Sequence, residues 1–122
     1  MRITVLGATG MAGTAVVNEA LSRGHEVTAV SRRRRHRAGA RLTSRLLDVT
    51  DVEGVAGLLK DSDAAVVALR PPAGHESDLA QLTTAVLDAA SRNRTPLLII
   101  GGAAPLSSPT DPSTLAIDDP TI

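Results

Sequence analysis

Gly-Ala-Thr-Gly-Met-Ala-Gly, at residues 7–13, directly follows the apolar run Ile-Thr-Val-Leu at residues 3–6. An extended run, a glycine-rich turn and a helix, in this order, form an arrangement that holds phosphate groups. We expect Gly7 to permit the turn, Gly10 to admit a pyrophosphate close to the backbone, and Gly13 to let the helix pack tightly. The start of that helix offers unpaired N–H groups and the positive end of its dipole to an anion.

Outward from this turn, apolar runs alternate with segments of helical periodicity. The predicted strands cover residues 2–6, 26–30, 46–49, 64–69 and 96–100, and the predicted helices cover residues 11–23, 51–60 and 76–93. The last two strands are continuous apolar runs, which are typical of strands buried on both faces. The arginine-rich segment 32–45 has no regular structure in this interpretation.

Helical spacing also predicts which residues face the core. Gly24 is expected just past the end of the first helix, and Asp51 or Thr50 is expected to cap the second. The predicted inward residues are Ala12, Val16 and Ala20 in the first helix, Val52, Val55, Ala56 and Leu59 in the second, and Leu79, Leu82, Thr83, Val86, Leu87 and Ala90 in the third.

Strands that alternate with helices form a parallel sheet with right-handed crossovers. The sequence therefore predicts an α/β fold, a Rossmann-type doubly wound sheet of about five strands in the order 3-2-1-4-5. Residues 1–102 would form this domain. Residues 103–122 are rich in Pro, Ser, Thr and Asp and would form an irregular tail or the start of a further lobe. Ligands of such sheets bind at the carboxyl ends of the strands, near the switch point.

Composition excludes several kinds of chemistry. The 122 residues include no Cys, Phe, Trp or Tyr, so disulfides, thiolate catalysis and a tyrosine acid are excluded. The three histidines, His25, His36 and His75, have no metal-ligand spacing, and we expect no metal site. No serine has a recognisable His and acidic partner, which argues against a hydrolase. Without a signal peptide or a membrane-spanning apolar run, the expected location is cytoplasmic and no membrane partner is expected.

The charges are unevenly distributed along the chain. Seven arginines and no acidic residue lie between Val27 and Leu47, whereas the remaining sequence has six basic and thirteen acidic residues, a net charge of −7. A local basic patch on an acidic domain favours a specific anionic ligand. Nucleic acid is the weaker interpretation, because the basic run is short and contains no aromatic residue.

The first residues of this arginine-rich segment directly follow the second predicted strand, where the ribose of an adenosine would lie. An acidic residue there accepts a hydrogen bond from the 2′-hydroxyl of NAD, but this chain has Ser31, Arg32 and Arg33. These residues suit a 2′-phosphate instead, so NADP(H) is the expected cofactor, preferred over NAD(H). A solvated arginine run is the alternative, and we favour it for residues 34, 35 and 37.

Other candidate residues follow the remaining strands. Asp48 and Val49 could contact an adenine ring, or Asp48 could be a turn or capping residue. Leu69 and Arg70 follow the fourth strand beside the expected path of the nicotinamide ribose, where Arg70 could meet phosphate or substrate or remain a surface charge. Gly101, Gly102 and Ala103 follow the fifth strand and would border the nicotinamide. Thr9 and Met11 complete the pyrophosphate turn, and no catalytic residue is identified.

The chain resembles the atypical short-chain dehydrogenase/reductase proteins with an NAD(P)H-binding domain. Within them it is similar to the flavin reductase/biliverdin reductase B-type enzymes and to NmrA-like proteins. The resemblance rests on residues 7–13, on Gly-His-Glu-Val-Thr at 24–28, on Ser31-Arg32 and Asp48-Val49, and on the apolar strands with their following Gly-Gly-Ala. The family's domain normally continues beyond this point, so the chain looks like the N-terminal portion of such a protein.

This resemblance implies an NADP(H)-binding oxidoreductase that transfers hydride between NADPH and a small acceptor, a flavin or a quinone-like molecule. The tyrosine and serine used by many relatives are absent, so hydride transfer would depend on positioning alone. A non-catalytic NmrA-like redox sensor is the alternative, and an epimerase or dehydratase is the third interpretation. The exposed sheet edge expected in a short form makes a homodimer a further hypothesis.

Overall fold

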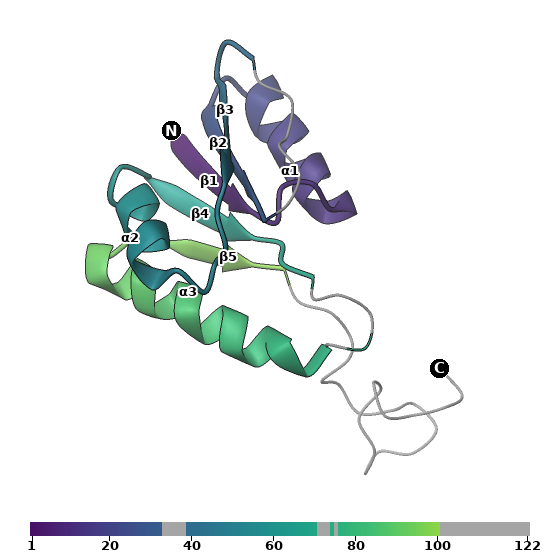
Figure 1. Ribbon diagram of the computed structural model, residues 1–122. Coiled ribbons are helices and arrows are strands. Elements are labelled where there is room, and N and C mark those ends of the chain that lie inside the picture. The colour runs from purple at the N-terminus through teal and green to yellow at the C-terminus, as the bar shows by residue number, and fades with distance from the viewer. Residues whose placement is uncertain (33–38, 71–73, 75, 101–122) are drawn as a thin grey trace, which may run out of the picture.

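The computed structural model describes residues 1–32, 39–70, 74 and 76–100 of the chain. They form a five-stranded parallel sheet between two helical layers (Figure 1). The elements in chain order are β1 (Arg2–Leu6), α1 (Met11–Ser22), β2 (Glu26–Ser31), β3 (Leu42–Leu46), α2 (Val52–Lys60), β4 (Ala64–Val67), the 3₁₀ turn η1 (Glu76–Asp78), α3 (Leu79–Asn93) and β5 (Leu97–Ile99). The strand order, β3-β2-β1-β4-β5, confirms the predicted doubly wound topology.

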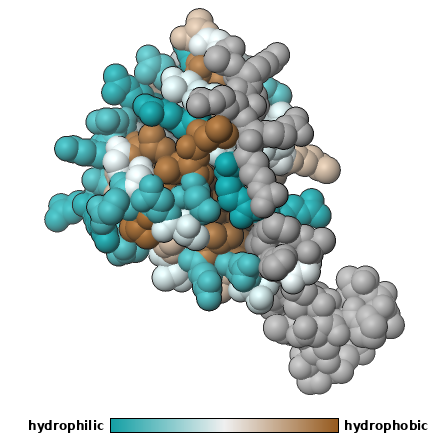
Figure 2. Space-filling view, in the orientation of Figure 1, coloured by the Kyte–Doolittle hydropathy of each residue, from teal (hydrophilic) through white to brown (hydrophobic). Residues whose placement is uncertain are grey.

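Alternation along the strands creates two cores, one on each face of the sheet. In β1, Val5 packs on the α1 side and its neighbour Leu6 packs on the α2 and α3 side. Because the chain has no aromatic residue, small aliphatic side chains fill both layers. In Figure 2, brown hydrophobic side chains remain visible among hydrophilic ones on the face turned to the viewer. Within the described ranges, no helix is long and apolar enough to cross a membrane.

The third strand begins earlier than predicted. The structure has β3 at Leu42–Leu46 rather than 46–49, so part of the segment expected to lack regular structure is a strand. Its register on β2 runs from Val27 opposite Leu42 to Ser31 opposite Leu46, which buries Leu42 and leaves Arg45 exposed. Only one strongly apolar residue points to the core, so the sequence pattern of this edge strand is weak.

The predictions of which residues of α1 and α3 face the core are also partly wrong. In α1 the buried residues are Gly13, Val17 and Ala20, whereas Ala12 is exposed. In α3 the buried residues are Val86, Ala89 and Ala90, whereas Leu79 and Leu87 are exposed. Alanine and leucine occur around most of each helix, so helical periodicity alone does not select one face. The predicted face of α2 is confirmed: Val55 and Leu59 are buried, Val52 and Ala56 half-buried, and Asp51 caps the helix.

The fifth strand is not buried as predicted. Leu98 is 63% exposed, and Ile99 and Ile100 are exposed as well. Among the described residues, β5 pairs only with β4 and therefore forms an edge of the sheet. The fourth strand ends at Val67, two residues before the predicted end. The predicted tail, residues 103–122, lies outside the described residues.

Candidate functional site

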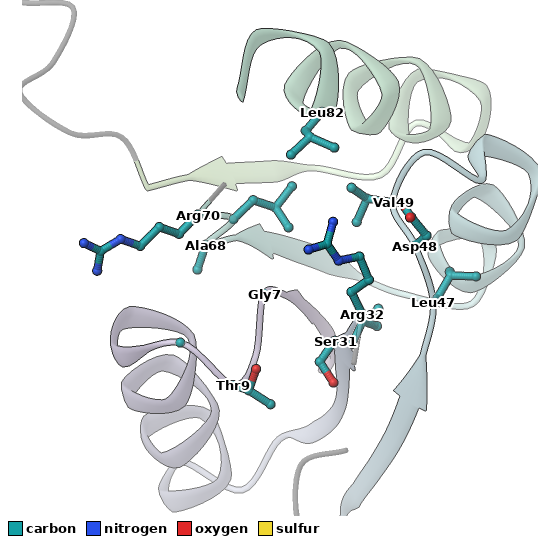
Figure 3. A pocket seen from close by; sticks show the side chains of 13 residues that line it. Gly7, Thr9, Ser31, Arg32, Leu47, Asp48, Val49, Ala68, Arg70 and Leu82 are labelled. Carbon is teal, nitrogen blue, oxygen red and sulfur yellow. The ribbon is translucent and has the colours of Figure 1, made fainter. Parts of the chain in front are cut away.

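A cleft of about 380 Å³ opens at the carboxyl ends of the strands, where the sheet changes direction between β1 and β4. Apolar residues from β2, α3 and the segments after β3 and β4 form most of its wall, and Arg32, Asp48 and Arg70 contribute charged side chains (Figure 3). The cleft is lined by Gly7, Thr9, Gly10, Val30, Ser31, Arg32, Leu47, Asp48, Val49, Ala68, Leu69, Arg70 and Leu82.

The three glycines of the turn have three different environments. Gly7 has φ +83°, and a Cβ there would collide with the backbone of Ala68. A Cβ on Gly13 would collide with the Gly7 carbonyl, so α1 lies directly against the turn. Gly10 has an ordinary extended conformation and its added Cβ would meet only the Gly7 oxygen, at 3.6 Å. The fold therefore requires glycine at positions 7 and 13 but gives no internal reason for glycine at position 10.

Hydrogen bonds fix the backbone of the glycine turn, but no side chain caps the start of α1. The N–H groups of Gly7 and Ala8 both donate to the Val30 oxygen at 3.0 Å, and Thr14 Oγ1 donates to the Ala8 oxygen at 3.1 Å. Gly10, the N-cap residue, provides no side-chain hydrogen bond, and the first turn of α1 contains no acidic residue. A helix start with these features can accept an anion.

The end of β2 contributes a basic side chain, Arg32, to the cleft. Ser31 is buried, and the exposed Arg32 extends from the same strand end into the cleft (Figure 3). Both predicted residues therefore line the cleft at this strand end. Arg33, the third residue predicted there, lies outside the described residues.

Asp48 and Val49 lie in the loop after β3, and not at the end of a strand as predicted. Val49 is buried in the wall of the cleft, whereas Asp48 is exposed. The backbone N–H and the hydroxyl of Thr50 donate to Asp48 Oδ1 at 3.0 and 2.8 Å. These two bonds, with a smaller contribution from the Arg32 charge, lower the pKa of Asp48 below its ordinary value. Asp48 is therefore a turn residue that also presents an ionised carboxylate to the cleft.

The segment after β4 forms the opposite side of the cleft. The Ala68 N–H donates to the Leu6 oxygen at 2.8 Å, which continues the β1–β4 pairing up to the glycine turn. Leu69 is half-buried and Arg70 is exposed, and both line the cleft. The predicted nicotinamide border, Gly101, Gly102 and Ala103, lies outside the described residues.

Of the predicted site residues that the structure describes, two do not line the cleft, and four lining residues were missed. Met11 is 88% exposed, and Gly13 is buried behind the turn. The missed residues are apolar: Val30, Leu47, Ala68 and Leu82. Three of them adjoin predicted site residues in the sequence, so proximity could have indicated them. Leu82 comes from α3, and only the tertiary packing places it there.

No group of three potential metal ligands occurs among the residues that the structure describes. Asp48, with its Thr50 contacts and its neighbouring arginine, does not have the surroundings of a metal carboxylate. The donors at the cleft are instead backbone N–H groups and guanidinium groups. These groups suit phosphate oxygens.

Known proteins resemble this chain over nearly its whole length. Residues 7–120 match the model of the NAD(P)H-binding family. The uncharacterized protein YwnB of Bacillus subtilis is 32% identical over 123 residues, which cover 98% of this chain and 56% of the relative. The chain thus spans little more than half of that protein's length.

Solved structures extend the same comparison. A candidate NADH-flavin reductase from Streptococcus pneumoniae is 28% identical with a TM-score of 0.74, covering 100% of this chain and 57% of its own. A candidate epimerase from Bacteroides thetaiotaomicron is 28% identical with a TM-score of 0.77, and the match covers 99% of this chain and 55% of the epimerase chain. The sheet order, the glycine turn and the family match agree, and the chain belongs to the NAD(P)H-binding family, with a Rossmann-type nicotinamide dinucleotide domain.

Proposed function

We propose that the cleft binds NADP(H) in preference to NAD(H) and positions its nicotinamide for hydride transfer to a small acceptor, a flavin or a quinone-like molecule. The observation that carries the proposal is Gly10. This glycine lines the cleft beside the uncapped start of α1, and no contact among the described residues requires it. Glycine at this position leaves room for a pyrophosphate against the backbone, room that a side chain would fill.

The residues on the two sides of the cleft differ, and this difference determines which half of the cofactor would lie on each side. Arg32 and Ser31 would bind the 2′-phosphate, and the carboxylate of Asp48 would accept a hydrogen bond from the adenine amino group while Val49 packs on the ring. The adenosine half therefore lies over β2 and β3. The nicotinamide half extends over β4, beside Leu69 and the half-buried Leu82. This assignment depends on the absence of an acidic residue at the end of β2.

The bound cofactor supplies a hydride, and the chain supplies orientation. Hydride transfer to an acceptor consumes one proton from water as the reduced acceptor forms, so a dedicated protein acid is not required. The apolar wall formed by Val30, Val49 and Leu82 excludes water from the rings. Support for a flavin acceptor comes from the Streptococcus pneumoniae structure, itself described as a candidate NADH-flavin reductase.

A non-catalytic NADP-binding sensor is the second candidate. The observation that favours it is the exposed β5 edge with Leu98 and Ile99, a surface on which a partner protein could read the occupancy of the cleft. An epimerase activity is third, suggested by the Bacteroides structure and opposed by the absence of tyrosine from the sequence.

Calorimetric titration with NADPH and NADH at one fixed salt concentration tests the cofactor assignment. We expect micromolar binding of NADPH and at least tenfold weaker binding of NADH. Steady-state NADPH oxidation with flavins and quinones then separates the reductase from the sensor, which would bind NADPH without turnover. A folded chain that binds neither dinucleotide would contradict both candidates.

A further inference from the structure

Among the described residues, the cleft has one arginine on each side of the glycine turn. Arg32 follows β2 and Arg70 follows β4, and β1 with its turn lies between these two strands. Figure 3 shows the guanidinium of Arg70 extending away from that of Arg32. The two guanidinium groups therefore lie on opposite sides of the glycine turn.

No interaction with a described residue explains the presence of Arg70 at this position. Arg92 pairs with Glu53 and Asp88, and Arg23 pairs with Glu19 at 2.9 Å, but no described residue forms an ion pair or hydrogen bond with Arg70. Arg70 is exposed, lies three residues beyond Val67, the last buried residue of β4, and still lines the cleft. Its charge is available to a ligand.

The cofactor does not account for Arg70 either. In the proposed orientation the 2′-phosphate meets Arg32 and the pyrophosphate meets the turn at Gly10. The nicotinamide riboside that remains carries no further anionic group, and its oxidised ring is itself a cation. The nicotinamide riboside therefore offers Arg70 no counter-charge of its own.

We propose that Arg70 binds an anionic group of the acceptor, and that the flavin preferred at this site is therefore flavin mononucleotide rather than riboflavin. The inference rests on the proposed function. With the nicotinamide beside Leu69 and Leu82, the flavin ring would lie on the nicotinamide, and Arg70, exposed on the same side of the cleft, would be available to its phosphate. The hydride passes from C4 of the nicotinamide to N5 of the flavin and a proton from water is added at N1, so Arg70 participates in binding only.

Fluorescence titration of both flavins into the chain saturated with NADP⁺ tests this inference, because the oxidised cofactor allows binding without turnover. We expect flavin mononucleotide to bind about tenfold more tightly than riboflavin, the effect of one charge-assisted contact. Arg70→Gln should bring the two affinities together and leave riboflavin binding unchanged. Arg45→Gln is the matched control, because it removes the same charge from an exposed residue of a separate groove on β3.

The outcomes separate this inference from the proposed function. A folded chain that does not bind NADP⁺ would overturn both. If NADP⁺ binds but the two flavins bind equally, or neither binds, only the Arg70 inference falls. It also falls if Arg70→Gln weakens NADP⁺ binding and leaves the preference between flavins intact, because Arg70 would then be a cofactor contact.

Discussion

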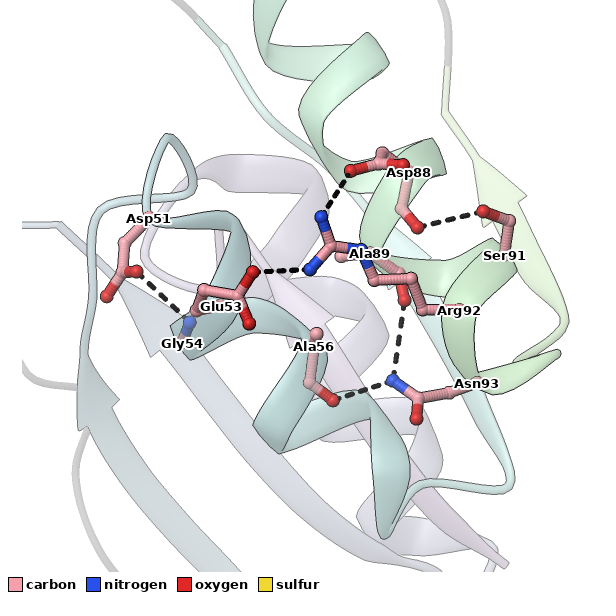
Figure 4. Close-up of polar contacts among 9 residues, drawn as sticks. All are labelled: Asp51, Glu53, Gly54, Ala56, Asp88, Ala89, Ser91, Arg92 and Asn93. Atoms are coloured by element: carbon pink, nitrogen blue, oxygen red, sulfur yellow. Dashed lines mark hydrogen bonds and ion pairs between the residues drawn. The ribbon is translucent and has the colours of Figure 1, made fainter.

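The cleft and the contact between α2 and α3 use polar residues in opposite ways. Between the helices, Arg92 joins Glu53 to Asp88, and Asn93 Nδ2 donates to the Ala56 oxygen at 2.8 Å (Figure 4). At the cleft, no described residue forms an ion pair or hydrogen bond with Arg70, the charge of Arg32 acts on the neighbouring carboxylate of Asp48, and Gly10 has space for a side chain. Polar groups that satisfy one another stabilise the fold, whereas groups that the chain leaves available indicate a ligand.

This contrast predicts that changes between the helices alter stability and that changes in the cleft alter binding. The largest expected effect concerns Gly13, which belongs to the fold although it is part of the glycine motif. In Gly13→Ala the new Cβ would lie 2.8 Å from the Gly7 carbonyl carbon and 2.9 Å from Ala8 Cα. We expect a loss of about 3 kcal/mol in the free energy of unfolding, measured by urea denaturation.

Gly57→Ala is the control for that measurement, because nothing lies within 4 Å of the added Cβ. Alanine is the better helix former in the exposed middle of α2, so this variant should be slightly more stable than the parent. An unchanged urea midpoint for Gly13→Ala would contradict the close contact of α1 with the turn.

Gly10→Val should abolish nucleotide binding in a chain that remains folded. The extended backbone at position 10 tolerates a side chain, and valine would occupy the space proposed for the pyrophosphate. We expect at least a hundredfold loss of NADPH affinity by calorimetry, with an unchanged far-ultraviolet circular dichroism spectrum. Retained binding would mean that the glycine turn serves structure alone.

Arg32→Glu should weaken NADPH binding far more than NADH binding. The substitution replaces an attraction for the 2′-phosphate with a repulsion, and NADH has no phosphate at that position. We expect roughly a hundredfold loss for NADPH and less than about threefold for NADH, at the same ionic strength. Equal losses for both cofactors would refute the 2′-phosphate assignment.

Asn93→Ala should affect stability and spare the cleft. The substitution leaves the Ala56 oxygen without its side-chain donor, and we expect the free energy of unfolding to fall by about 1 kcal/mol. NADPH affinity should stay within about twofold of the parent value. Arg92→Gln, which removes two exposed ion pairs, should cost less than this.

Thr50→Val should produce the smallest effect, a rise in the pKa of Asp48. The valine keeps the backbone donor and removes the hydroxyl donor to Asp48 Oδ1. Because the folded-state pKa lies below the ordinary value, the interaction stabilises the fold above the unfolded-state pKa and is lost as the pH falls through the folded-state pKa. Carboxyl NMR titration measures the shift, and Thr50→Ser, which retains the hydroxyl, should show little change.

Most of the cleft could be predicted from the sequence because its residues follow strands directly. The glycine turn, Ser31 with Arg32, and Leu69 with Arg70 each stand at a strand end, and parallel strands bring their carboxyl ends to one edge. Asp48 and Val49 line the cleft although β3 ends before them. A loop at the end of a strand reaches the same edge, which makes the assignment insensitive to a shift of a few residues.

Burial was less predictable, because it depends on neighbours distant in the sequence. The apolar pattern of residues 97–100 is the same for a central strand and for an edge strand, and only pairing shows that β5 has β4 as its described neighbour. The choice between Leu87 and Ala89 as a core residue of α3 likewise depends on where α2 lies.

Local chain chemistry was sufficient to determine the alternation of strands and helices, the turn at Gly7 and the basic character of the β2 end. These features depend on backbone conformation, apolar periodicity and charge within a few residues. Tertiary structure alone distinguished the three glycines, brought Leu82 from α3 to the cleft and left Arg70 without a partner among the described residues. Such properties depend on which atoms of remote segments occupy the space around a residue, and no local pattern records that.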